Sequence, residues 1–177
     1  MSDTLITIIS IFLAAILMFI FPLMSVSERN DDIAQTVVQT ATSDFVDDIT
    51  TSGAIKASSY EAYQSKLQAT GNTYDIEMEV QHLDENPGKK ATATSGDLIG
   101  ENVRYSTYTT EIMDKMYEDT NTNETYPLKK GDNVIVTVKN TNKTIAQMLR
   151  TFFYKITGQG SYQVAASASS MVVNNGK

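Results

Sequence analysis

The chain opens with a long apolar stretch that changes abruptly into a mixed pattern. No charged residue occurs between Leu5 and Leu23, and about 19 residues in a helix match the thickness of a bilayer core. The first residues include no Lys or Arg, and no small-residue cleavage pattern follows, so a removed secretory signal is the weaker alternative. We predict an uncleaved membrane helix with these residues for insertion and assembly: Leu5, Ile9, Phe12, Leu13, Ile16, Phe19, Ile20 and Pro22.

Pro22 lies near the end of this apolar stretch, and no glycine occurs before Gly53. A proline inside a helix removes one backbone hydrogen bond and crowds the carbonyl four residues earlier, so we expect a kink at this position. The sequence then predicts one helix from Thr4 to Thr50. This helix is either a membrane span that meets the surface at the proline or a longer, curved stalk.

Beyond the apolar stretch, hydrophobic residues recur at every fourth position, while the acidic residues lie mostly off that stripe. This pattern predicts an amphipathic helix. We therefore interpret residues 1–26 as the apolar half of a transmembrane and stalk helix and residues 27–52 as its amphipathic half. The stripe is expected to pack on the head of the protein or on neighbouring helices, and it consists of Ile33, Val37, Ala41, Phe45 and Ile49.

Residues 53–177 alternate between helical and strand patterns and are predicted to form a head domain. A short helix is expected after Gly53, with Ser59 as its N-cap and Gly71 at its end. Strict alternation of apolar and polar residues then predicts a strand at 73–83. A surface loop is expected at 84–100. Residues 106–119 favour a short helix with Ile112, Met116 and Tyr108 facing inward, although a strand is an alternative.

Two further strands are predicted near the end of the chain, at 133–140 and 161–173, with an apolar helix between them at 141–158. Val164, Ala166, Ala168 and Ser170 would share one face of the last strand, where small side chains let a helix approach closely. The expected fold class is α+β: a long N-terminal helix packed on a small, mainly antiparallel sheet with additional short helices.

Composition and charge argue against several kinds of function. Acidic residues outnumber basic ones by 21 to 14, the formal net charge is −7, and no basic cluster occurs, which argues against nucleic acid as a partner. The chain has no cysteine, and its only histidine, His82, ends a strand and is expected to lie at the surface. Asp119, Asn121 and Asn123 imitate half of a calcium loop, but Glu124 and Lys130 replace its essential Gly and Glu. We therefore predict no enzyme activity, no cofactor and no metal site.

The combination of these features resembles a known family. A charge-poor N-terminal helix that continues into an amphipathic stalk looks like a type IV pilin or pseudopilin. The C-terminal pattern GDNVIVTVKN, followed by an apolar helix and YQVAASASSMVVNNG, is similar to the small pseudopilin-like proteins of tight-adherence (Tad) pilus systems. The resemblance covers the N-terminal helix and about the last 50 residues. One departure is that no acidic residue occurs from Leu5 to Met24, where prepilins carry a glutamate.

The resemblance implies a structural, membrane-anchored component of a bacterial surface filament or of its assembly machinery. Its partners would be the membrane, other copies or other pilin-like subunits, and a secretion or assembly platform. It also implies a single-pass protein in the cell membrane with an extracellular C-terminal domain. A different class of function stays open at this point, namely a monomeric, single-pass ligand-binding or sensor module. Loss of filaments or complexes on deletion of the helix would separate the two.

Overall fold

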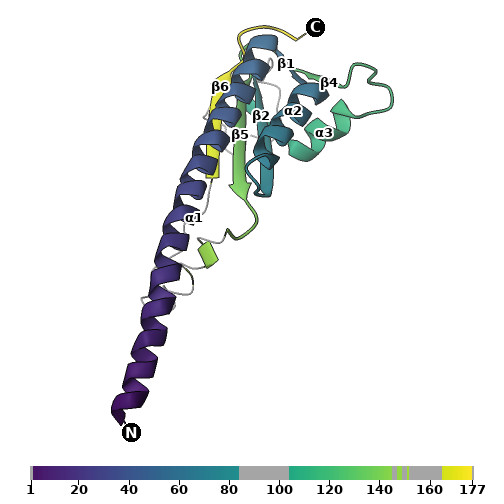
Figure 1. Cartoon of the computed structure of the whole chain (residues 1–177). Coiled ribbons are helices and arrows are strands. Elements are labelled where there is room, and N and C mark those ends of the chain that lie inside the picture. Colours follow the sequence, from purple (N-terminus) through teal and green to yellow (C-terminus); the bar gives the residue numbers. More distant parts are fainter. Residues whose placement is uncertain (1, 84–103, 145–146, 149–150, 152–164, 177) are drawn as a thin grey trace, which may run out of the picture.

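The protein consists of one long helix and a small α+β head that lies against the C-terminal half of this helix (Figure 1). This computed structural model describes residues 2–83, 104–144, 147–148, 151 and 165–176. Its elements are, in order, α1 (Ser2–Ser52), β1 (Ala54–Lys56), α2 (Ala57–Gln68), β2 (Tyr74–Leu83), β3 (Arg104–Tyr108), α3 (Thr109–Met116), β4 (Thr125–Pro127), β5 (Asn133–Asn140) and β6 (Ala165–Met171). The α+β fold class predicted from the sequence is confirmed.

Helix α1 is continuous from Ser2 to Ser52 and includes Pro22 in its interior. It ends where the sequence predicts, because Gly53 has a positive φ of 73° and its N–H donates to the carbonyl of Ile49 at 2.8 Å. A Cβ atom at position 53 would lie only 2.4 Å from the carbonyl oxygen of Asn174. Gly53 is therefore needed both for the helix stop and for the close approach of the C-terminal segment.

The main sheet has four antiparallel strands in the order β3-β2-β5-β6. The two-residue alternation of β2 is observed: Met78 and Val80 are buried on one face, while Asp75 and Glu77 are exposed on the other. β5 alternates in the same way, with Val134, Val136 and Val138 inward. The sheet thus has one buried face and one open face, as the sequence pattern of these two strands predicts.

Helix α1 packs on β6 and β5 at the buried face of the sheet (Figure 1). Ala166 is buried and Ala168 is half-buried on this face of β6. Small side chains at these positions let the helix approach the strand, as expected from the sequence. Gln35 reaches across this contact and donates to the carbonyl of Ala165 at 2.8 Å. The first and last elements of the chain therefore share one core.

Several details of the head differ from the sequence prediction. Ser59 does not cap α2: the helix starts at Ala57, and the Ser59 hydroxyl donates instead to Asp48 on α1 at 2.8 Å. Residues 104–116 form both a strand and a helix, with Ile112 and Met116 buried as predicted but Tyr108 exposed. The small antiparallel pair β1–β4 was not expected, because three-residue strands carry no periodic pattern.

Some predictions concern segments outside the described residues. The loop expected at 84–100 lies there entirely, and the apolar helix expected at 141–158 lies there for most of its length. The same applies to Val164, the first residue of the predicted small-residue face of β6.

Candidate functional site

The most distinctive surface of the molecule is the N-terminal half of α1, which extends beyond the head (Figure 1). This part of the helix is long and apolar enough to cross a membrane. None of the residues in its most apolar 18-residue stretch is buried. Phe12 is 69% exposed and Phe19 is 75% exposed. An uncovered apolar surface of this size is unfavourable in water and calls for lipid or a protein neighbour. Of the residues predicted for this site, the exposed ones are Leu5, Ile9, Phe12, Leu13, Ile16, Phe19 and Pro22, and Ile20 is half-buried.

The C-terminal half of the same helix forms part of the core of the head. Phe45 is only 4% exposed, and its ring stacks on that of Tyr63 with centroids 4.4 Å apart and an interplanar angle of 6°. The ring of Tyr60 also lies 6.2 Å from Phe45 in a tilted arrangement. Ala41 and Ile49, from the predicted stripe, are buried as well. This half of α1 is therefore fixed to α2 and to the sheet by large aromatic and aliphatic contacts.

A buried hydroxyl pair fixes the position of α2 on α1. Thr42 donates its only hydroxyl hydrogen to the carbonyl of Val38 at 2.7 Å, so Tyr63 is the donor in the 2.8 Å bond between the two hydroxyls. Burial raises the pKa of Tyr63 to about 12, although the bond to Thr42 opposes this shift. The phenol thus keeps its proton at any physiological pH, and the donor role assigned by geometry agrees with its ionisation state.

Two residues of the predicted stripe do not pack on the head: Ile33 is 55% exposed and Val37 is 40% exposed. The reason is geometric. An α-helix turns about 100° per residue, so each step of four residues rotates the side chain by about 40° beyond a full turn. Over the four steps from Ile49 back to Ile33 the rotation reaches about 160°. The face that is buried follows the steps of three, four and seven residues that the helix repeat favours, and its apolar members are Ala34, Val38, Ala41, Phe45, Val46 and Ile49.

Ile33 and Val37 instead share a face with Val26, which is 59% exposed. The separations of seven and eleven residues place Ile33 and Val37 about 20° to either side of Val26, so the three side chains lie within about 40° of the helix circumference. They continue the exposed apolar surface of α1 past Pro22 and toward the head. We call the three residues the outer stripe.

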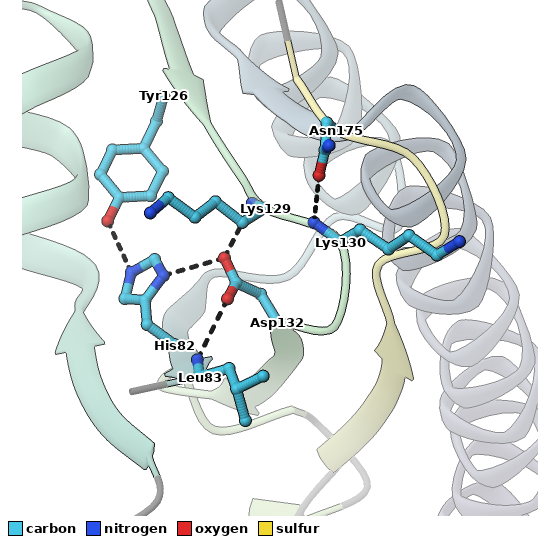
Figure 2. A network of polar contacts seen from close by, with 7 residues as sticks. All are labelled: His82, Leu83, Tyr126, Lys129, Lys130, Asp132 and Asn175. Atoms are coloured by element: carbon cyan, nitrogen blue, oxygen red, sulfur yellow. Dashed lines mark hydrogen bonds and ion pairs between the residues drawn. The ribbon is translucent and has the colours of Figure 1, made fainter. Parts of the chain in front are cut away.

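A buried polar network lies at the end of the head near the C-terminal segment (Figure 2). His82 Nδ1 lies 2.9 Å from Asp132 Oδ2, and His82 Nε2 lies 2.9 Å from the hydroxyl of Tyr126. A carboxylate accepts only, so His82 Nδ1 carries a hydrogen and donates it to Asp132. The side chains of His82 and Asp132 are 11% and 1% exposed. The expectation of a surface histidine was therefore wrong.

Asp132 also organises the turn that precedes β5. Its carboxylate accepts from the backbone N–H of Lys129 at 2.9 Å and of Leu83 at 3.3 Å (Figure 2). The next backbone N–H, that of Lys130, donates to Asn175 Oδ1 at 2.7 Å. The network thus joins β2, β4, this turn and the C-terminal segment. Its hydrogen-bonding atoms are committed to one another, which is the pattern of a structural network.

The calcium-like sequence also has a structural explanation. The side-chain amide of Asn121 donates to the carbonyls of Lys115, Met116 and Thr125, and so closes the loop between α3 and β4. Glu124 has a positive φ of 46° at the position where a calcium loop needs glycine. Within the described part of the chain, no group of three or more His, Cys, Asp or Glu residues is arranged to hold a metal ion.

No protein-family model, no curated protein and no solved structure matches this chain.

Proposed function

We propose that this chain is a structural, pilin-like or pseudopilin-like component of a bacterial surface filament or of its assembly machinery. Residues of the apolar half of α1 would anchor it in the cell membrane as a single pass, with the head of residues 53–177 outside the cell. The observation that supports this proposal most directly is the continuity of α1, which is uncovered and apolar at one end and built into the core of the head at the other.

This continuity favours a mechanical role over a flexible anchor. A receptor domain is commonly joined to its membrane helix by a linker that lets it move. Here, the stacking of Phe45 on Tyr63 and the bond from Tyr63 to Thr42 fix the head to the helix. Such a subunit presents its head in a defined direction relative to its anchor, which is what a regular assembly requires.

Assembly with neighbouring subunits would cover the apolar surface of α1 that lies outside the bilayer. A helix that leaves the membrane exposes its side chains to water unless neighbouring helices cover them. The outer stripe of Val26, Ile33 and Val37 lies beyond the apolar span and gives such neighbours an apolar surface. The partners would be other copies of this chain or other pilin-like subunits, together with a secretion or assembly platform.

The proposal is tested by cysteine crosslinking, because the natural chain contains no cysteine. Single substitutions at four consecutive positions, which sample the whole circumference of the helix, are oxidised in native membranes and in sheared surface material: Ile9→Cys, Ser10→Cys, Ile11→Cys and Phe12→Cys. We expect covalent dimers whose yield varies with helical periodicity. Asp47→Cys, on an exposed face of the packed half of α1, is the matched control.

The same experiment distinguishes a sensor module that works alone. Such a protein would give low yields at all four positions, or equal yields without periodicity from random collisions in the bilayer. It would also be missing from sheared material. Either result would contradict the filament proposal while leaving the membrane anchor itself intact.

A further inference from the structure

The strand pairing on one side of β2 covers only part of the strand. β3 pairs with β2 only from Glu79 to Leu83, whereas β5 pairs with β2 from Tyr74 to Gln81. Beside Tyr74–Glu77, on the side away from β5, none of the described residues forms a strand. The chain instead turns from β3 into α3 at Thr109. In the part of the chain that the structure describes, one side of β2 is therefore open over its first four residues.

Thr109 marks the point where strand pairing stops. Its hydroxyl accepts from the N–H of Met78 at 2.7 Å and lies 3.2 Å from the Met78 carbonyl. These two contacts occupy the backbone groups of Met78 that face away from β5. Backbone groups alternate in direction along a strand, so the N–H and C=O of Ile76 point to the same open side. They form an unpaired site at which a further strand can add.

A concave depression of about 570 Å³ adjoins this open edge. Its lining includes Ile76 and Glu77 from β2, Tyr108 and Thr109 from the end of β3 and the start of α3, and Ile135 from β5. The Tyr108 ring is 60% exposed at the rim. The depression gives room for side chains on the open face of the sheet, and its floor contains both apolar and polar groups.

The charge of this depression is negative. Asp75, Glu77 and Glu79 project from alternate positions of β2 onto the open face, and Lys139 is the cation opposite them in the register. Lys139 binds Glu77 at 2.9 and 3.0 Å, and this exposed ion pair is easily exchanged. Among the described residues, three carboxylates face one ammonium group, which leaves the surface complementary to a basic ligand.

From these observations we propose that the open edge of β2 binds an extended segment of a partner polypeptide with Lys or Arg at alternate positions. The segment adds as a short strand beside Tyr74–Glu77, with hydrogen bonds to Ile76. Its basic side chains point to the open face beside Asp75 and Glu77, at cross-strand distances of about 5 Å between Cβ atoms. This interaction is independent of membrane insertion and of filament assembly.

The intervening residues of the bound segment point to the opposite face, toward α2. A space of only about 70 Å³ lies there between Leu67 of α2 and the side chains of Tyr74 and Ile76. Small residues such as Ala, Ser or Gly are therefore expected at these positions. The recognised pattern is an alternation of basic and small residues.

The binding test uses the full chain in detergent micelles and a labelled, end-capped peptide of sequence Arg-Ala-Arg-Ala-Arg. Two matched peptides are measured beside it: one with N-methylated Ala residues, which removes the strand-pairing donors, and one with Glu in place of Arg. Fluorescence anisotropy gives the affinities. We expect both changes to weaken binding by about tenfold or more.

Two measurements on the protein locate the peptide. Binding should slow hydrogen exchange of the Ile76 amide and leave the Glu77 amide, which faces β5, unchanged. The double variant Asp75→Asn/Glu77→Gln should bind the peptide about three- to tenfold more weakly than the natural chain. The control variant Asp47→Asn, on α1, should bind it as tightly as the natural chain does. Equal binding of the N-methylated peptide, unchanged exchange at Ile76, or no binding up to about 1 mM peptide would each overturn the proposal.

Discussion

The two halves of α1 have similar length and belong to the same helix, yet they meet opposite environments. Phe12 and Phe45 illustrate the contrast: the first is 69% exposed, and the second is 4% exposed and stacked on Tyr63. The N-terminal half is apolar on all sides, which suits a helix surrounded by lipid or by other helices. The C-terminal half is apolar on one side only, which suits a helix on a sheet. The comparison shows that helix propensity is common to both halves and that the distribution of polar residues determines the environment of each.

The largest expected effect is on the packed half. Phe45→Ala removes a ring that contacts both Tyr60 and Tyr63 and leaves a cavity, so the free energy of unfolding should fall by about 3–5 kcal/mol. Ile33→Ala, at an exposed position of the same helix, is the control and should change stability by less than about 0.5 kcal/mol. Chemical denaturation of the full chain in detergent measures both. Equal losses would show that the outer stripe belongs to the core of the head.

A charge in the apolar half tests the other side of the comparison. Leu13→Arg places a cation near the middle of the expected span, where insertion costs about 2.5–3.5 kcal/mol. We expect a large fall in the fraction of protein that resists alkaline extraction from membranes. Ile33→Arg lies outside the span and should leave this fraction unchanged. If Leu13→Arg resists extraction as fully as the natural chain does, position 13 does not lie near the middle of a membrane span.

The network at His82 gives a change confined to the head. His82→Ala leaves the buried carboxylate of Asp132 and the hydroxyl of Tyr126 without their imidazole partner, so we expect a loss of about 1–3 kcal/mol in stability. Membrane extraction and crosslinking through α1 should be unchanged. If the variant keeps its melting temperature but loses activity in any assembly assay, His82 has a functional role beyond this network.

The smallest effect concerns the hydroxyl bond between the helices. Tyr63→Phe should cost about 1 kcal/mol near neutral pH, because the bond to Thr42 is lost while the ring packing is kept. An unfolded tyrosine has a pKa of about 10, whereas burial raises the pKa of Tyr63 to about 12 in the fold.

The pH dependence of this difference follows from the two pKa values. Below pH 10 both states keep the proton, so the contribution of Tyr63 is constant. Between about pH 10 and pH 12 the unfolded chain binds fewer protons than the folded one, and the stability falls as the pH rises. The natural chain should therefore lose stability faster than Tyr63→Phe in this window. Parallel curves would mean that Tyr63 is accessible to water in the fold.

The sequence predicts those parts of the fold whose patterns are long and local. Residues 74–81 of β2 alternate strictly, and α1 has no glycine until Gly53, so both elements were correct to within a few residues. The stripe at every fourth position packs on the head near Phe45 but not at Ile33, because a spacing of four drifts around the helix over several turns. The three-residue strands β1 and β4 are too short to show a period.

The unpredicted features are those that depend on distant residues. His82 meets Asp132 fifty positions later and Tyr126 forty-four positions later, and nothing near His82 in the sequence indicates either partner. The open edge of β2 is similar, because it results from the place where β3 ends and not from the residues of β2 themselves. The exposed apolar half of α1, in contrast, was predictable from composition alone.

The contact between α1 and β6 determines when the chain can fold. Gln35 bonds to the carbonyl of Ala165, 130 residues away, and the backbone N–H of Val173 donates to Thr50 at 3.1 Å. Contacts of such long sequence separation slow folding, because a large loop must close before they form. While the chain is being synthesised, α1 exists long before β6, so its buried face and the outer edge of β5 lack their cover until the last strand arrives. The head therefore completes its folding only after synthesis of the chain has reached β6. Because α1 is synthesised first, its insertion into the membrane can precede the folding of the head.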